Sequence, residues 1–265
     1  MTPHAAAPTP APSSVAPDVP AVPGIEAEAV RLRTDEVVGG QVQVRVTDTG
    51  DDGFTVTAVA LDSPGFAGLP PTAVTADFAP GRVIDLPTPY GTPVCDAAPV
   101  PAAALMSVAR PDGAVESVRV PLAADVLVVV HDEECAVRAV EEVVGVSVTG
   151  LADDGDALSG TLTLTRRNGD ERVVATALSR SVLLDAVAEG LPLELAAGER
   201  SATTAVSFAP ATCDPHVLSE TKKPYVFPLT VEVGDADPVP VDLPLDGAAR
   251  DRLAALVQRV CGVAN

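Results

Sequence analysis

Aromatic side chains are scarce in this sequence, which has no tryptophan, two tyrosines and five phenylalanines among 265 residues. A core built on large rings is therefore excluded, and the apolar residues, 47% of the chain, are mostly valine, alanine and leucine. Valine favours strands because its branched side chain packs well on a pleated surface. Twenty-six prolines and twenty glycines supply turns. The mixture predicts short strands joined by loops, as in sandwiches or barrels.

Basic residues are also few, since 17 Lys and Arg face 37 Asp and Glu for a net charge of −20. The only lysines are the adjacent Lys222 and Lys223. This acidic balance predicts that the protein does not bind nucleic acid, which it would repel, and disfavours anionic membrane surfaces. The charge fits solubility, attraction to a basic partner, or divalent-cation binding.

No run of about 18 apolar residues occurs, which predicts no transmembrane segment. Residues 1–24 lack the apolar stretch of a signal peptide and form a Pro/Ala-rich segment that we expect to be a disordered linker. A linker at this position suggests that a signal peptide or membrane anchor preceded it. We therefore expect an extracytoplasmic protein, secreted or anchored through such a missing segment.

Recognisable catalytic motifs are missing as well. There is no G-x-S-x-G, Walker loop, H-E-x-x-H or G-x-G-x-x-G sequence. The S-x-x-K pattern from Ser219 to Lys222 lacks its S-D-N and K-T-G partners. The sequence thus predicts a protein that is not an enzyme and has no cofactor.

The strongest positive signal is an internal repeat. Cys95 lies in YGTPVCD and Cys213 in FAPATCD, and each is followed by two apolar runs separated by a turn, then by another apolar segment with a second cysteine, Cys135 or Cys261. The runs end alike, in Val-Pro-Leu and Leu-Pro-Leu. The repeat predicts two domains, at residues 25–141 and 142–265.

Several local elements follow from pattern. Residues 42–47 and 54–59 alternate apolar and polar side chains, which predicts a half-buried antiparallel hairpin. Asn168-Gly169 predicts a second hairpin between residues 158–165 and 173–178. Asp246 and Gly262 bracket a helical apolar spacing, which predicts a capped helix. The corresponding segment, residues 123–134, fits a helix by the repeat and a strand by its β-branched run.

The cysteines admit three pairings. The repeat favours Cys95 with Cys135 and Cys213 with Cys261, which implies an oxidising compartment. Four thiolates or a zinc site are the alternative, although the C-x₂₋₄-C spacing usual for zinc is missing. A weak metal site is conceivable at Asp214, His216 and Glu220. The competing interpretation is that Asp214 caps a turn started by Pro215.

The segment from Val42 to Phe66, VQVRVTDTGDDGFTVTAVALDSPGF, resembles a strand–turn–strand phrase of immunoglobulin-like sandwich domains, V-x-V-x-N-T-G-x-x-x-F-T-V. Asp48 stands where Asn is usual, as an exposed turn tolerates. With CDPHVLSETKK and the four cysteines, residues 25–265 resemble uncharacterised actinobacterial envelope or secreted proteins. The resemblance implies two tandem immunoglobulin-like β-sandwich domains, each with a short closing helix, and no known activity.

We therefore expect a non-enzymatic binding or structural module of the cell envelope, with a protein or cell-wall partner. The candidate interaction loop runs from Cys213 to Tyr225 and holds His216, Lys222 and Lys223. The alternatives are a metal-binding or metal-handling extracytoplasmic protein that uses His216, Asp214 and acidic turns, and an enzyme of unrecognised type.

Overall fold

A computed structural model describes residues 19–262 and is mainly β. The chain divides into two compact units, residues 1–131 and 132–265. The division falls inside helix α2 (Asp125–Val143), on which the boundary expected from the repeat also lies. Of the expected linker, residues 1–18 lie outside the described residues, whereas Val22 forms a β-bridge with Ile25.

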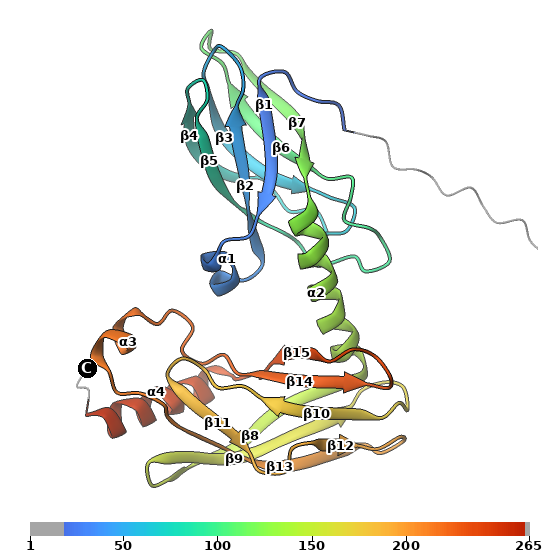
Figure 1. Cartoon of the computed structure of the whole chain (residues 1–265), viewed down its shortest axis with the longest axis vertical. Helices are drawn as coiled ribbons and strands as arrows, with labels where there is room; N and C mark the ends of the chain where they lie inside the picture. The colour runs from blue at the N-terminus through green and yellow to red at the C-terminus, as the bar shows by residue number, and fades with distance from the viewer. Residues whose placement is uncertain (1–18, 263–265) are drawn as a thin grey trace, which may run out of the picture. The chain divides into compact units, whose positions relative to one another are not determined.

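The first unit contains one seven-stranded sheet in the order β4-β3-β6-β7-β1-β2-β5 (Figure 1). The short helix α1 (Arg33–Val38) lies between β1 and β2 in the chain. Its strands are β1 (Ile25–Val30), β2 (Gln41–Asp48), β3 (Phe54–Asp62), β4 (Thr72–Phe78), β5 (Val83–Pro89), β6 (Ala103–Ala109) and β7 (Val115–Ala123). Neighbours are antiparallel except β1 and β7, which run parallel. The sheet curls until its end strands, β4 and β5, lie beside each other.

The core of the first unit comes from alternate residues of these strands. Val42, Val44 and Val46 of β2 are fully buried, as their period-two spacing predicts. Phe54 and Phe78 stack with ring centroids 4.7 Å apart, so even the few aromatic residues are used inside. Burial of these aliphatic faces is the main stabilising term for the unit.

The hairpin expected between residues 42–47 and 54–59 is wrong, although both strands exist. Strand β2 pairs with β1 and β5, and β3 pairs with β4 and β6. The turn after Asp48 therefore carries the chain to a distant position in the sheet order. Alternation shows which face of a strand is buried and leaves its neighbour undetermined.

The second unit contains two four-stranded antiparallel sheets, which lie as two layers in Figure 1. One has the order β11-β13-β9-β8 and the other β12-β10-β14-β15. The strands are β8 (Val144–Asp154), β9 (Ala157–Arg166), β10 (Val173–Leu178), β11 (Leu184–Ala188), β12 (Leu193–Leu195), β13 (Ser201–Pro210), β14 (Pro228–Val233) and β15 (Val239–Asp242). Phe208 and Phe227, both fully buried, meet edge to face between the layers, with centroids 5.0 Å apart.

The hairpin expected at Asn168-Gly169 is also wrong. Strand β9 pairs with β8 and β13, while β10 pairs with β12 and β14, so the turn joins the two sheets. The Asn168 side chain donates to the Glu142 carbonyl at 2.8 Å, and Gly169 takes a φ of +68°. The Asn-Gly pair thus serves a tight turn whose outer contacts are with the end of α2.

Three pairs of consecutive strands do form antiparallel hairpins. Strands β6 and β7 pair around Pro111-Asp112-Gly113, with Gly113 at a φ of +86°. Strands β14 and β15, the two apolar runs after Cys213, also pair, as do β8 and β9. In each, a short polar turn brings the following strand back antiparallel beside the preceding one.

The expected helix after Asp246 is confirmed as α4 (Gly247–Cys261). The Asp246 side chain accepts a hydrogen bond from the Ala249 amide at 2.7 Å, and Gly262 ends the helix in the left-handed conformation. Leu253, Leu256 and Val257 are buried on one face. The segment after Ala123, for which helix and strand both remained open, is the start of helix α2.

Candidate functional site

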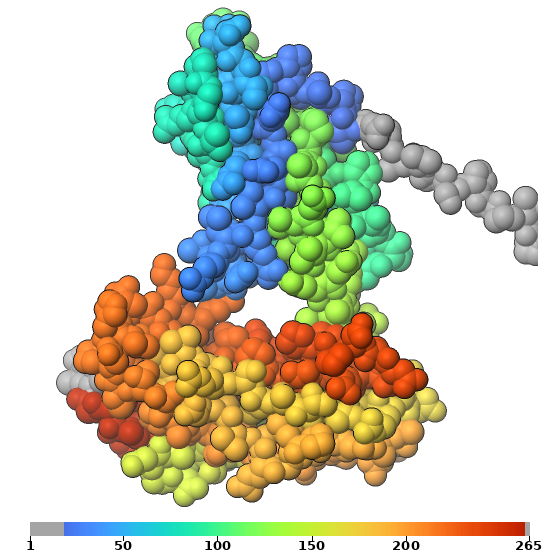
Figure 2. Space-filling view, in the orientation of Figure 1, coloured from blue at the N-terminus to red at the C-terminus, as the bar shows by residue number. Residues whose placement is uncertain are grey.

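The expected interaction loop is fixed at its start by a disulfide. Cys213 is bonded to Cys261 of α4, with a Cα–Cα distance of 5.2 Å. Cys95 and Cys135 are disulfide-bonded as well, and the described residues contain no free cysteine. The orange segment that carries the loop lies on the surface of the second unit (Figure 2).

Within this loop, residues Pro215–Glu220 form the short helix α3. Asp214 is its N-cap, because its carboxylate accepts hydrogen bonds from the amides of His216 and Val217 at 2.8 and 3.3 Å. The capping role considered for Asp214 is therefore the one that the structure shows. Val217 and Leu218 pack on the core of the second unit, so the exposed face of α3 has a rigid base.

The loop's polar residues lie outward to different degrees. His216 and Lys222 are exposed, whereas Lys223 and Tyr225 are half-buried. Burial raises the pKa of the Tyr225 phenol above its usual value. An exposed basic side chain and a half-buried aromatic ring in the same loop are groups that can contact an acidic or aromatic partner.

The metal interpretation of this loop gains no geometric support. One carboxylate oxygen of Asp214 accepts the hydrogen bonds of the helix cap, and Glu220 is the last residue of the six-residue α3. Over residues 19–262 there is no group of three or more His, Cys, Asp or Glu that could hold a metal ion.

His131, the other histidine among the described residues, lies inside the first unit. It is 6% exposed, its Nε2 lies 3.2 Å from the Val94 carbonyl oxygen, and Phe66 meets it edge-on. This environment is that of a core histidine that holds the start of α2 against the segment before Cys95.

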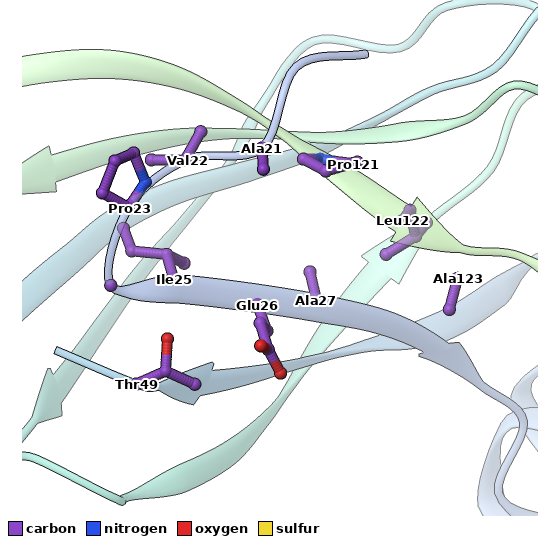
Figure 3. Close-up of a pocket in the computed structure, with 11 residues that line it drawn as sticks. Ala21, Val22, Pro23, Ile25, Glu26, Ala27, Thr49, Pro121, Leu122 and Ala123 are labelled. Atoms are coloured by element: carbon purple, nitrogen blue, oxygen red, sulfur yellow. The ribbon is translucent and has the colours of Figure 1, made fainter. Parts of the chain in front are cut away.

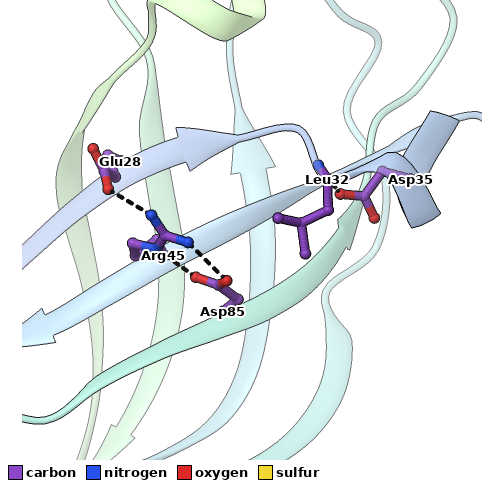
Figure 4. A network of polar contacts seen from close by, with 5 residues as sticks. All are labelled: Glu28, Leu32, Asp35, Arg45 and Asp85. Atoms are coloured by element: carbon purple, nitrogen blue, oxygen red, sulfur yellow. Dashed lines mark hydrogen bonds and ion pairs between the residues drawn. The ribbon is translucent and has the colours of Figure 1, made fainter.

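A buried carboxylate network that the sequence patterns did not indicate is centred on Asp35 of α1. Asp35 is 1% exposed and accepts a hydrogen bond from the Leu32 amide at 2.8 Å (Figure 4). It also accepts hydrogen bonds from the side-chain amides of Gln41 and Gln43, at 2.7 and 2.5 Å. Because Gln41 and Gln43 are two residues apart on one strand, their side chains share a face. That spacing was the available signal, but it did not identify Asp35 as their acceptor.

A second network lies on the solvent side of the same sheet. Arg45 binds Asp85 through two hydrogen bonds, at 2.7 and 3.0 Å, and reaches Glu28 at 3.4 Å (Figure 4). The Asp85 carboxylate raises the pKa of the Arg45 guanidinium. The residues come from three adjacent strands, β1, β2 and β5, so the network ties these strands together.

Asp48, expected in an exposed turn, is 1% exposed, so that expectation is wrong. One carboxylate oxygen accepts from the Gly50 amide at 2.9 Å, which shapes the turn. Its backbone also bonds to Gly81 and Arg82, next to β5. Asp48 is buried because these backbone hydrogen bonds hold it against the residues just before β5.

Each unit has a shallow hollow on its described surface. The first, about 550 Å³, lies where β1 and β7 diverge and is lined mainly by small apolar residues, with Glu26 and Thr49 as polar members (Figure 3). The second, about 340 Å³, lies between β8 and the first turn of α4 and includes Arg252. The first lining is mainly apolar, and the second includes the Arg252 guanidinium and the Asp246 carboxylate.

The chain matches no known protein family and no curated protein. Among solved structures, a red sea bream transglutaminase is similar at 11% identity and a TM-score of 0.24, over 85% of this chain and 32% of that one. The YadV chaperone is similar at 11% identity and a TM-score of 0.23, over 84% of this chain and 100% of that one. A Porphyromonas gingivalis W83 protein of unknown function is similar at 15% identity and a TM-score of 0.19, over 84% of this chain and 100% of that one. These values carry no argument about fold or function. Across the described residues, no helix is long and apolar enough to cross a membrane.

Proposed function

We propose that this protein is a non-enzymatic binding or structural module of the cell envelope, built from two tandem immunoglobulin-like domains. The observation that carries the proposal is a shared order of elements. In both units a cysteine precedes the hairpin of the last two strands. A helix that carries a second cysteine follows each hairpin, and for the first unit this cysteine, Cys135, lies on the part of α2 beyond the division. The recurrence supports an internal duplication.

Strand order supports the immunoglobulin-like assignment. Constant-type domains place strands A, B, E and D in one sheet and C, F and G in the other. In the second unit, β8, β9, β13 and β11 hold the first set of places, while β10, β14 and β15 hold the second. In the first unit, β1, β2 and β5 hold the A, B and E places, and β3, β6 and β7 those of C, F and G. The extra strands β4 and β12 lie beside the C position.

Disulfide bonding of all four cysteines supports a place outside the cytoplasm, where such bonds persist. Within that compartment we propose the loop from Cys213 to Tyr225 as the binding surface. It presents Lys222, a positive charge on a chain of net charge −20, from a base held by the disulfide and by the core contacts of α3. An acidic protein or cell-wall polymer is the partner that this surface fits.

The compartment is tested by mass spectrometry of unreduced peptides from protein recovered by secretion. Linked peptides Cys95–Cys135 and Cys213–Cys261 are expected. Free thiols in the secreted protein would remove the envelope assignment.

Binding is tested by cosedimentation with purified cell-wall sacculi and, separately, by retention of solubilised envelope proteins. We expect binding in one assay and its loss in the variant Lys222→Glu/Lys223→Glu. The matched control is Arg180→Glu/Arg200→Glu, which reverses two exposed charges elsewhere in the second unit. Absence of binding in both assays, or equal loss in the control, would overturn the proposal.

A further inference from the structure

The free edges of the sheets are protected in different ways. A free edge exposes unpaired backbone N–H and C=O groups that can pair with another chain. In an antiparallel pair, alternate residues turn both groups toward the partner strand, and the residues between them turn both groups away. The hydrogen bonds at the strand ends therefore show which residues face outward on each edge.

Two edges carry outward-facing prolines. On β15, the bond from the Leu243 amide to the Phe227 carbonyl places Pro240 and Asp242 outward. On β5, the bond from the Tyr90 amide to the Gly40 carbonyl places Pro87 and Pro89 outward. Proline has no N–H to donate, so neither edge is a good template for another strand.

The edge of β11 is closed by its own chain. The bond from the Ala211 amide to the Leu183 carbonyl places Leu184 outward. The Leu184 amide donates to the Ser181 hydroxyl at 3.0 Å, and its carbonyl accepts from the Ser181 amide at 2.9 Å. Ser181 thus occupies the place of an added strand at that residue.

Strand β8 has no such protection. It is the longest strand, with 11 residues, and β9 is its one paired neighbour in the described part of the chain. The bond from the Arg167 amide to the Val143 carbonyl places Val144, Val146 and Val148 outward. Neither a proline nor a charged residue occurs in β8 before Asp153.

We propose that the free edge of β8 pairs with the same edge of a second copy of this chain, antiparallel and centred on Val146. In this register Val146 lies opposite its own counterpart, and Val144 lies opposite Val148. All three outward-facing residues then form hydrogen-bonded pairs, because each meets another outward-facing residue. The contact is self-complementary, as a two-fold dimer requires.

Charge supports a second copy as the occupant. Two chains of net charge −20 repel each other, yet the pairing segments are uncharged and oppose no like charges. The same register brings the end of α2, with the exposed Glu141 and Glu142, toward the residues after Thr149 of the other copy. Arg252 lies there, in the 340 Å³ hollow, where its guanidinium donates to the Leu151 carbonyl at 2.7 Å. Arg252 of one copy therefore lies near Glu141 and Glu142 of the other at both ends of the contact, beside Asp246, whose carboxylate caps α4.

Sedimentation equilibrium of the full chain over a range of concentrations tests the proposal. We expect a dimer for the wild type and a dissociation constant raised at least about tenfold in Val146→Pro, which loses an outward N–H from each copy. The variant keeps every hydrogen bond to β9, since the Val146 N–H points away from that strand. Ala188→Pro is the matched control, because it places the same substitution at an outward position of β11.

A second variant separates an interface effect from misfolding. Ser147→Asp puts a carboxylate on the outer face of the contact and leaves the backbone unchanged, so we expect dissociation that added salt partly reverses. A monomeric wild type at every concentration would overturn the proposal. So would a dimer that persists in both Val146→Pro and Ser147→Asp, with melting temperatures that show both variants folded.

Discussion

The first and last strands of the two units are arranged differently. In the first unit β1 and β7 pair in parallel over two positions, Ala27 with Leu122 and Glu28 with Ala123, and this joins all seven strands in one sheet. In the second unit β8 and β15 hold the same places in chain order but do not pair, and the sheets stay separate. Two residue pairs therefore decide whether the first strand is internal or has a free edge.

The length and outward residues of the last strand explain this difference. Strand β7 has nine residues, while β15 has four and turns Pro240 outward. A four-residue strand with proline at one of its outward positions offers fewer outward N–H groups than the nine-residue β7. The shortness of β15 and its outward proline fit the open edge of β8.

Removing the disulfide of the second unit is expected to have the largest effect on this comparison. The variant Cys213→Ser/Cys261→Ser opens a loop with a sequence separation of 48, which corresponds to about 4 kcal/mol by loop entropy. Calorimetry should show a lower transition for the second unit and an unchanged one for the first. Equal destabilisation of both units would show that they do not unfold separately.

The helices that follow the last strands allow a matched test. Leu127 of α2 and Leu256 of α4 are both fully buried, in the cores of the first and second units respectively. Leu127→Ala and Leu256→Ala should each cost about 3 kcal/mol in unfolding free energy. Hydrogen exchange followed by mass spectrometry should locate each loss in its own unit. A loss confined to the helix itself would contradict its place in the core.

A smaller effect is expected at Asp35, whose helix α1 has no counterpart in the second unit. Asp35→Asn replaces one acceptor oxygen with an NH₂ group that faces the amides of Gln41 and Gln43. The unfolding free energy of the first unit should fall by about 2 kcal/mol. Gln41→Glu would add a second carboxylate beside Asp35 and should destabilise further, unlike the conservative control Glu36→Gln at an exposed position.

The smallest effect concerns the titration of Tyr225. Its pKa is raised by burial, so any stability that it contributes is present below the unfolded pKa and is lost as pH rises through the folded value. Absorbance titration of wild type and Tyr225→Phe should assign this late ionisation. Reducing the Cys213–Cys261 bond should return the pKa toward its usual value, whereas an unchanged pKa would show that the disulfide does not hold the loop.

Sequence patterns predicted elements better than their neighbours. The capped helix after Asp246 depends on local spacing, and hairpins such as the one at Pro111-Asp112-Gly113 depend on a short turn between strands in one sheet. The turns at Asp48 and Asn168 look the same in the sequence yet lead to strands elsewhere in the sheet order. Partner choice depends on long-range packing, which periodicity does not encode.

The candidate site was predicted in part for the same reason. Capping by Asp214 follows from the residues beside it, since Pro215 starts a helical turn. The burial of Asp35 depends on Gln41 and Gln43 folding back over α1. The free edge of β8 depends on a strand, β15, whose shortness matters only once both sheets are known.

Helix α2 ends at Val143 and β8 begins at Val144, so no loop separates them. A codon inserted or deleted near this point would exchange the residues of β8 that face β9 with those that face away, because no slack absorbs the change. Natural insertions, affinity tags and reporter fusions should therefore be tolerated at the exposed turn Asp51-Asp52 and rejected here. The junction between α2 and β8 therefore fixes the register in which β8 pairs with β9.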